Sequence, residues 1–337
     1  MSADALSDLL KTVRLTGATF FDVVARDPWV AEQPAKEVVL PLVLPGAAHL
    51  IAYHVLIEGR CYASLIGEEA IAMEAGEVVV FTRGDPHVMC SSPGMRADPF
   101  ASGALGAASA SQLPIAVNYG AEGPVTAKLV CGFLACDAHP FNPLLESLPA
   151  VIKCGKLGDD DAGWLAQFIR LATSESSSKR AGGETVLSRL SELMFIEVVR
   201  RYLDALPPQQ AGWLAGLRDP FVGKALSLMH ACPSRSWALE DLARDVGLSR
   251  SALAERFAEL VGMPPMHYLA KWRMQIASGL LSGGTNIASV AAEIGYGSEA
   301  SFSRAFKKVV GVPPSAWRQR FGSGQDDMPA GERRLAG

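Results

Sequence analysis

The first part of the chain has the hydrophobic pattern of short β-strands. From residue 1 to about residue 140, short apolar runs such as LIAYHVLIEG, YASLIG, EAIAM and EVVVFTRGD alternate with glycines, prolines or charged pairs. Such runs between turn-forming residues are typical of an antiparallel sandwich or barrel. The stretch from Arg96 to Gln112 is rich in Ala, Ser and Gly and has no period, which predicts a mobile surface loop.

The apolar period becomes helical after Asp160. Two stripes follow, one of Trp164, Leu165, Phe168 and Leu171, the other of Val186, Leu190, Leu193, Phe195, Ile196 and Val199. This spacing predicts two amphipathic helices on either side of SSSKRAGG. Because an exposed apolar stripe needs cover, the two helices either pack on the β domain or form a subunit interface.

The stretch from Leu239 to Phe321 contains one helical unit written twice. Ala243 aligns with Ala291, Gly247 with Gly295, Leu253 with Phe302 and Phe257 with Phe306, and each copy ends in Gly-x-Pro-Pro. In each copy a glycine suits the left-handed end of a first helix, a serine (Ser249 or Ser298) suits the cap of a second, and apolar residues four apart face inward. This pattern predicts two helix-turn-helix units.

The repeated unit resembles the DNA-binding domain of the AraC/XylS family of transcription regulators. The match covers about Pro220 to Phe321, and its most specific part is IGYGSEASFSRAFKKVVGVPPSAWR. The resemblance implies two helix-turn-helix units joined by a long helix, each with its second helix in the major groove. It also implies that the preceding helical pair is a dimerisation element.

A second resemblance lies in the β domain. Gly76 to His87 reads GEVVVFTRGDPH, which has the spacing of the second cupin motif except that Thr82 stands where a proline is usual. The domain therefore resembles the cupin-like sensor domain of AraC-type regulators. In this interpretation HVLIEGRCY is the preceding pair of strands.

The helix-turn-helix pattern also identifies the side chains that can face DNA. The predicted contacts are Ser249, Arg250, Ser251 and Arg256 in the first unit, and Ser298, Glu299, Ser301, Ser303, Arg304 and Lys307 in the second. Arginine can form two hydrogen bonds with guanine, and serine can form a hydrogen bond with a base or a phosphate. For each basic residue the alternative is a solvated surface or an intramolecular salt bridge. Glu255 stands where the family often has a basic residue, so we expect the first unit to read DNA less strongly.

Charge is distributed unevenly along the chain. The net charge is −4, but the stretch from Arg218 to Phe321 has 13 basic and 8 acidic residues. The preceding part is acidic. A cationic module attached to an acidic one favours attraction to the DNA backbone by the C-terminal part alone.

The β domain has four candidate effector residues. They are His54, His87, Cys90 and Cys131, and as a set they would suit zinc, the one candidate cofactor. Metal-dependent cupin enzymes usually carry a His-x-His pair, but Ala52 and Leu56 flank His54, so this pair is absent. The alternatives are core thiols with barrel-lining histidines, or a redox-sensing thiol at Cys61 or Cys90. The sequence contains no phosphate loop, nucleophile elbow or His-Glu-x-x-His, so catalysis has no motif.

Length and composition set the remaining limits. With 337 residues, 49% of them apolar, the chain can form two domains that each bury a core. The start, MSADALSDLLKTVRL, is acidic where a secretory signal is basic, and no apolar run approaches the ~18 residues of a membrane span. Six scattered cysteines without a Cys-x-x-Cys pair argue against a disulfide scaffold. These features predict a cytoplasmic protein that does not enter the membrane.

Together these observations predict an α+β multidomain protein. The expected parts are a cupin-like β-barrel or sandwich at residues 1–157, a helical dimerisation segment at 158–206, a linker at 207–219, an all-α double helix-turn-helix domain at 220–321 and a disordered tail at 322–337. The expected function is transcription regulation by a homodimer that binds promoter DNA and contacts RNA polymerase if it activates. Its effector would be a small ligand, a metal or a redox signal. The alternative is a cupin enzyme fused to a DNA-targeting module.

Overall fold

The structure is a computed structural model. It describes residues 4–13, 15–100, 114–120, 122–136, 140–155, 167–168, 171–172, 174–175, 180–207 and 210–322. The described residues of Val13–Ala138 and Pro143–Gln210 form one compact unit, here called the β unit. Those of Met1–Thr12, His139–Asn142 and Ala211–Gly337 form a second, the helical unit.

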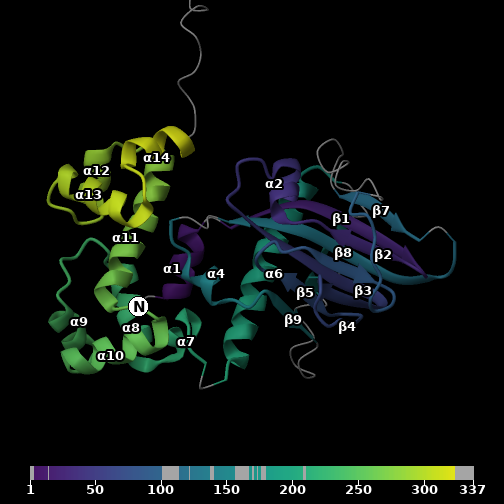
Figure 1. Cartoon of the computed structure of the whole chain (residues 1–337), viewed down its shortest axis with the longest axis horizontal. Helices are drawn as coiled ribbons and strands as arrows, with labels where there is room; N and C mark the ends of the chain where they lie inside the picture. The colour runs from purple at the N-terminus through teal and green to yellow at the C-terminus, as the bar shows by residue number, and fades with distance from the viewer. Residues whose placement is uncertain are drawn as a thin grey trace, which may run out of the picture. The chain divides into compact units, whose positions relative to one another are not determined.

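The β unit is a curled sheet (Figure 1). Its strands are β1 (Thr16–Arg26), β2 (Val30–Gln33), β3 (His49–Leu65), β4 (Ile71–Glu74), β5 (Val78–Phe81), β6 (His87–Cys90), β7 (Ile115–Tyr119), β8 (Val125–Cys136) and β9 (Val151–Cys154). The strand order is β2-β6-β3-β8-β1-β7, with β4 and β5 also paired to β3, and β9 to β5. The short helices α2 (Lys36–Val43) and α4 (Pro143–Ser147) belong to the same unit. The predicted cupin-like β domain is confirmed.

Strand β3 connects the two halves of the curled sheet. Its first part pairs with β5 and β8, and its last residues pair with β4 and β6. The bend follows a register shift between Leu56 and Glu58, and Gly59 adopts φ +85° there. A Cβ at Gly59 would lie 1.8 Å from the carbonyl oxygen of Thr126, so this position requires glycine. The predicted pair of strands in HVLIEGRCY was therefore wrong, because the glycine bends one continuous strand.

The concave side of the sheet encloses an apolar core. Alternate residues of β1, β3 and β8 point into it, among them Phe21, Leu56 and Phe133. The rings of Phe21 and Phe133 meet edge to face, with centroids 5.9 Å apart. Full burial of each such side chain stabilises the fold by about 1.5–3 kcal/mol relative to its exposure. The period-two pattern of the sequence thus corresponds to a real inner face.

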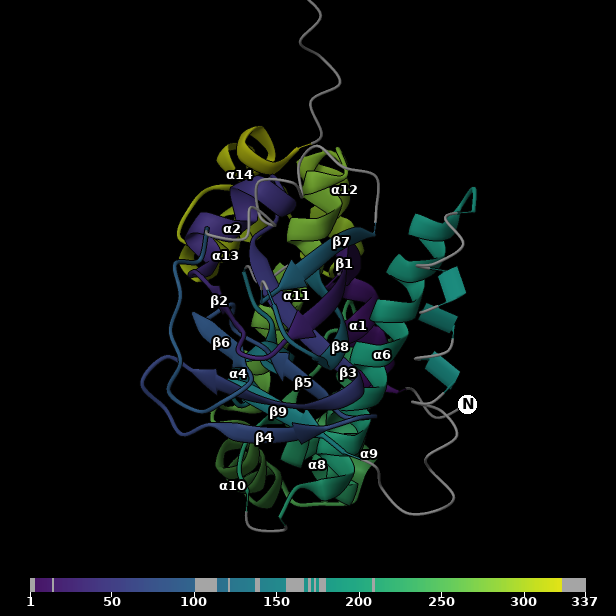
Figure 2. The same cartoon turned by 90° about the vertical axis from the view of Figure 1, so that its right-hand side faces the viewer.

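Helix α6 (Gly183–Ala205) packs along the sheet against β1, β8 and β9 (Figure 2). Phe195 and Val199 are buried, and the hydroxyls of Ser191 and Tyr53 lie 2.7 Å apart. Leu193 is nevertheless 56% exposed and Val186 42% exposed. The broad apolar stripe therefore covers two faces of the helix, one packed on the sheet and one open. Most of the helix predicted after Asp160 lies outside the described residues.

The helical unit contains two similar clusters joined by one long helix. Its helices are α1 (Ala5–Thr12), α7 (Trp213–Arg218), α8 (Pro220–Ala231), α9 (Leu239–Val246), α10 (Arg250–Val261), α11 (Pro265–Ser282), α12 (Ile287–Glu293), α13 (Glu299–Val310) and α14 (Pro314–Phe321). Figure 1 shows α11 running from the group of α8, α9 and α10 to the group of α12, α13 and α14. This confirms the predicted double helix-turn-helix architecture. Among the described helices, none is long and apolar enough to cross a membrane.

Three segments join the helical unit against expectation. The predicted linker at 207–219 contains α7, whose Trp213 is only 2% exposed and donates from Nε1 to the Tyr268 hydroxyl at 2.8 Å. Helix α1, predicted to lie in the β domain, packs on α8 and α11. The N–H of Phe141 also donates to Oε1 of Gln275 at 2.9 Å. In all three cases contacts in space, which sequence order does not reveal, decide where the segment belongs. The predicted tail lies outside the described residues from 323 onward, as does the predicted loop from 101 to 112.

Candidate nucleic-acid interface and ligand cavity

The two helix-turn-helix units have the local geometry that the sequence predicts. Gly247 and Gly295 adopt φ +89° and +83° at the ends of the first helices. Ser249 caps α10 by accepting from the N–H of Ala252 at 3.2 Å, and Ser298 caps α13 by accepting from the N–H of Ser301 at 3.2 Å. Each serine satisfies a backbone donor that the helix start leaves free.

Buried aromatic and aliphatic side chains fix which face of each second helix is outside. Leu253 and Phe257 on α10, and Phe302 and Phe306 on α13, are fully buried, as predicted. Most of the predicted DNA contacts are exposed: Ser249, Arg250, Ser251, Arg256, Ser298, Glu299, Arg304 and Lys307. Ser301 and Ser303 are half-buried. The geometry thus leaves one polar face of each second helix open to a partner.

Both candidate arginines of the first unit are held in ion pairs. Arg250 Nη1 lies 2.9 Å from Glu240 Oε1. Arg256 Nε lies 2.8 Å from Oδ2 of Asp219, the residue that caps α8. Burial alone would raise the pKa of Asp219, but hydrogen bonds from Arg256 and from two backbone N–H groups lower it overall. At Arg250 and Arg256 the structure therefore has the intramolecular salt bridge that is the alternative to DNA contact.

The second unit differs in its charge and in its pairing. Arg304 and Lys307 form no ion pair with any residue that the structure describes. The stretch Ile287–Phe321 has five basic and two acidic residues, whereas Leu239–Val261 has three basic and five acidic ones. Free cations attract phosphate more readily than cations that must first leave a carboxylate. The expected inequality of the two units thus has a structural basis.

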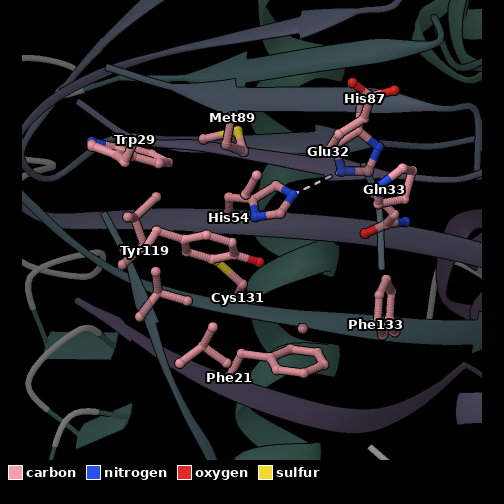
Figure 3. A pocket seen from close by; sticks show the side chains of 16 residues that line it. Phe21, Trp29, Glu32, Gln33, His54, His87, Met89, Tyr119, Cys131 and Phe133 are labelled. Carbon is pink, nitrogen blue, oxygen red and sulfur yellow. Dashed lines mark hydrogen bonds between the residues drawn. The ribbon is translucent and has the colours of Figure 1, made fainter. Parts of the chain in front are cut away.

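The β unit contains a cavity of about 80 Å³ on the concave side of the sheet (Figure 3). Apolar and aromatic side chains form most of its wall, among them Phe21, Met89, Tyr119 and Phe133. Its polar centre is a histidine pair, His54 on β3 and His87 on β6, whose Nε2 atoms lie 2.9 Å apart. The Phe81 ring stacks on His87 with centroids 3.8 Å apart and holds that ring in place.

Both histidines are neutral near physiological pH. Burial lowers the pKa of His54 well below 6.5, and the neighbouring His87 lowers it further. Burial lowers the pKa of His87 to about 4, although a hydrogen bond with the carbonyl of Asp85 acts in the opposite direction. A neutral pair can share one hydrogen bond, because each imidazole then has one donor and one acceptor nitrogen.

The four predicted effector residues do not gather at one point. His54, His87 and Cys131 line the cavity, but Cys90 does not. Successive residues of a strand face opposite sides, so His87 and Met89 point inward, and the Cys90 Sγ lies 3.9 Å from the Tyr62 carbonyl oxygen. In the described part of the chain, no group of three His, Cys, Asp or Glu residues could hold a metal ion. The set therefore does not fit the four-ligand zinc site considered above.

The two candidate redox thiols are poorly placed for that role. Both Cys61 and Cys90 are buried. Burial raises the pKa of Cys61 to about 12 and also raises that of Cys90. The thiolate is the reactive form, so this environment opposes oxidation chemistry.

Several cavity residues could not be found from sequence. Trp29, Glu32 and Gln33 reach the wall only because β2 pairs with β6. Arg96 donates from Nε and Nη2 to the Glu32 carboxylate, each at 2.7 Å. These side chains are far from the cupin motif in sequence, and no short-range pattern marks them. A weak hint was the polar Glu32-Gln33 pair in a strand-like stretch.

Comparisons with known proteins also find a cupin part followed along the chain by a helix-turn-helix part. The cupin family model matches residues 4–204, and a helix-turn-helix domain model matches residues 242–320. An AraC-like transcription regulator of Streptomyces lividans is 30% identical over 319 residues, which is 94% of this chain and 98% of that protein. The HTH-type transcriptional regulator AlkR of Acinetobacter baylyi is 26% identical and covers 94% of this chain and 99% of its own length.

One of the similar solved structures matches the C-terminal part of the chain. The C-terminal domain of AraT, a response regulator from Geobacillus stearothermophilus, is 30% identical. It covers 34% of this chain and 96% of that domain, with a TM-score of 0.31.

Proposed function

The chain belongs to the AraC-like family of transcription regulators, and from that premise we propose that it reads DNA mainly through its second helix-turn-helix unit under the control of a small effector. As an AraC-type regulator with a cupin-like sensing domain, it binds double-stranded DNA. The proposal concerns which residues do so and what controls them.

The observation that carries the proposal is the contrast between α13 and α10. Arg304 and Lys307 lie on the exposed face of α13 and form no ion pair with another described residue. Arg250 and Arg256 on α10 must leave Glu240 and Asp219 before they reach a phosphate or a base. Each phosphate that a cation neutralises releases counterions and adds to the affinity. The second unit therefore supplies most of the binding free energy in this proposal.

The test begins with finding the operator. Bound DNA is selected from a random pool with the full-length protein, with and without cell extract, and the best sequence is footprinted. We expect strong protection over the half-site of the second unit and weaker protection over the other half-site. Equal protection at low and high salt would overturn the assignment.

We further propose that the effector binds in the cavity at His54 and His87. These side chains are the polar centre of a mostly apolar wall. A ligand that prefers one state of the protein shifts the equilibrium between states by its difference in affinity. Replacing both histidines with alanine should preserve basal DNA binding and abolish the response of a reporter driven by the selected operator. A full response in that variant would place the effector site elsewhere.

Homodimerisation is proposed through the open face of α6. Leu193 and Val186 are exposed apolar residues on one side of that helix. A second copy of the same surface is the simplest cover for it in a symmetric dimer. RNA polymerase is a partner only if the selected operator supports activation, which the same reporter measures.

We propose no catalytic activity for this chain. The relatives above are named as transcription regulators, and the described residues hold no cluster of metal ligands. Bound metal together with turnover of a small acid or sugar would favour the enzyme alternative.

A further inference from the structure

The histidine pair in the cavity has fixed proton positions. Nδ1 of His87 lies 3.0 Å from the carbonyl oxygen of Asp85. A carbonyl only accepts, so this nitrogen carries the proton, and Nε2 of the neutral His87 ring is bare. His54 must therefore donate from Nε2 across the 2.9 Å contact. As a neutral ring with its proton on Nε2, His54 is left with a bare Nδ1 that can only accept.

This acceptor has no partner among the described residues. Nδ1 of His54 is buried and makes no hydrogen bond there. Two other cavity-lining side chains, Trp29 and Gln33, also have a buried nitrogen without a described partner. Most buried polar atoms in folded proteins make a hydrogen bond, because an unsatisfied one carries its full desolvation penalty. A cavity whose wall has polar atoms without a hydrogen-bond partner is suited to a ligand that supplies such a partner.

The cavity also disfavours charged ligands. Glu32 is the one acidic side chain in the described wall, and Arg96 neutralises it through two hydrogen bonds. Neither histidine is charged near neutral pH, because burial lowers the pKa of both. An ionised ligand would enter a low-dielectric space without a free counter-charge, which is strongly unfavourable.

Size and wall composition restrict the ligand further. The cavity volume is about 80 Å³. A buried cavity of roughly 150 Å³ holds benzene, so this cavity encloses about half of a single ring, and the rest of a ring-sized ligand lies at its open side. Aromatic rings at Phe21, Tyr119 and Phe133 surround this space (Figure 3). Aromatic side chains favour a flat apolar body that packs against their faces or edges.

We infer that the cavity takes an uncharged small molecule with an apolar, ring-sized body and a hydroxyl or N–H group that donates to Nδ1 of His54. This inference rests on the proposed function, because it assigns the chemical class of the effector at the same site. His54 is then the residue that selects the ligand. His87 positions it, since the proton on His87 Nδ1 determines which nitrogen of His54 is free.

Three probes of similar size separate the possible requirements. Phenol has the donor, anisole has the same ring and oxygen without the donor, and benzoate adds a negative charge. Calorimetric titration of the full-length protein should show that phenol binds at least about tenfold more tightly than anisole, with benzoate weaker still. In the His54→Phe variant, the affinity for phenol should fall to that for anisole. Equal binding of phenol and anisole to the parent protein would overturn the inference, because the cavity would then not require a donor group on its ligand.

Nitrogen NMR of the parent protein provides a test that needs no variant. The expected spectrum has a bare Nδ1 on His54 and a bare Nε2 on His87, and phenol but not anisole should shift the His54 Nδ1 signal. A proton on His54 Nδ1 in the parent protein would contradict the inference. Binding of all probes is measured without DNA. If the parent protein binds its operator but does not bind phenol, only the ligand class is refuted. If the parent protein binds no operator, the proposed function is refuted.

Discussion

Arg256 and Asp219 link the first recognition helix to the cap of another helix. Arg256 Nε lies 2.8 Å from Oδ2 of Asp219, while Oδ1 of the same carboxylate accepts from the N–H groups of Phe221 and Val222 at 3.0 and 2.9 Å. One carboxylate therefore caps α8 and also neutralises a guanidinium that faces solvent. Because the guanidinium side of this ion pair is about half exposed to solvent, a DNA phosphate can compete for this arginine.

The Asp219→Asn variant should release Arg256 without removing the cap. Asparagine caps a helix as well as aspartate does, but it has no charge to hold the guanidinium. We expect tighter operator binding, with a slope of log affinity against log salt that is steeper by about one. The matched control, Asp219→Ala, also removes the cap and should lose about 1 kcal/mol of stability in thermal unfolding. An unchanged salt slope in Asp219→Asn would mean that Arg256 does not reach the DNA backbone.

Substitution of Arg304 should weaken operator binding more than substitution of Arg256. In the Arg304→Ala variant a lost base contact would cost about 1–3 kcal/mol, and a lost phosphate contact would reduce the salt slope by about one. Arg256→Ala should change affinity by less than about threefold, because that arginine is already paired with Asp219. Both variants should keep the parent circular dichroism spectrum, since both side chains are exposed. Equal losses in a salt titration would contradict the proposed inequality.

The features that sequence predicted well depend on short-range signals. Gly247, Ser249 and Phe257 lie within one helical hairpin, and each has a local reason for its position: a left-handed helix end, a cap and a buried face. The same logic applied to the second copy. Period and capping were therefore enough to predict the helix-turn-helix units and the exposed face of each recognition helix.

The features that sequence missed depend on long-range pairing. Asp219 and Arg256 are 37 residues apart, and no periodic pattern connects them. The cavity was predicted only through His54, His87 and Cys131, because Trp29 and Gln33 reach its wall through the pairing of β2 with β6. Cys90 was grouped with His87 because they are close in sequence, but a three-residue separation on a strand puts side chains on opposite faces.

Two charges on the open face of α6 should dissociate a homodimer. Val186 and Leu193 are 42% and 56% exposed, so glutamate at both positions should leave the protomer folded. In a dimer seam the same two charges would be desolvated without partners. We expect Val186→Glu with Leu193→Glu to sediment as a monomer and to lose most operator affinity. Leu42→Glu, at an exposed apolar position of α2, is the matched control and should remain dimeric. A parent protein that already sediments as a monomer would refute the proposal.

Replacing Gly59 with alanine should disrupt the bend in β3. The new Cβ would lie 1.8 Å from a backbone oxygen in a position with φ +85°, so both steric clash and backbone strain oppose it. We expect a loss of more than about 3 kcal/mol in unfolding free energy. Gly67→Ala is the matched control, because Gly67 has φ +89° and no atom within 4 Å of the added carbon. That variant should lose only about 1–2 kcal/mol. Similar losses in urea denaturation would show that the contact with β8 does not constrain the bend.

The stability of the protein should fall as pH drops below the ordinary pKa of histidine. Burial lowers the pKa of His87 from 6.5 to about 4, so between these values the unfolded chain binds a proton that the folded chain does not. Stability is then full above about pH 6.5 and decreases towards acid, with a loss of about 2 kcal/mol from this group at about pH 5. The His87→Gln variant lacks this titration and should show a flatter profile in urea denaturation from about pH 7 to about pH 4.5. Parallel profiles for the parent protein and His87→Gln would show that the cavity histidine is not held neutral by the fold.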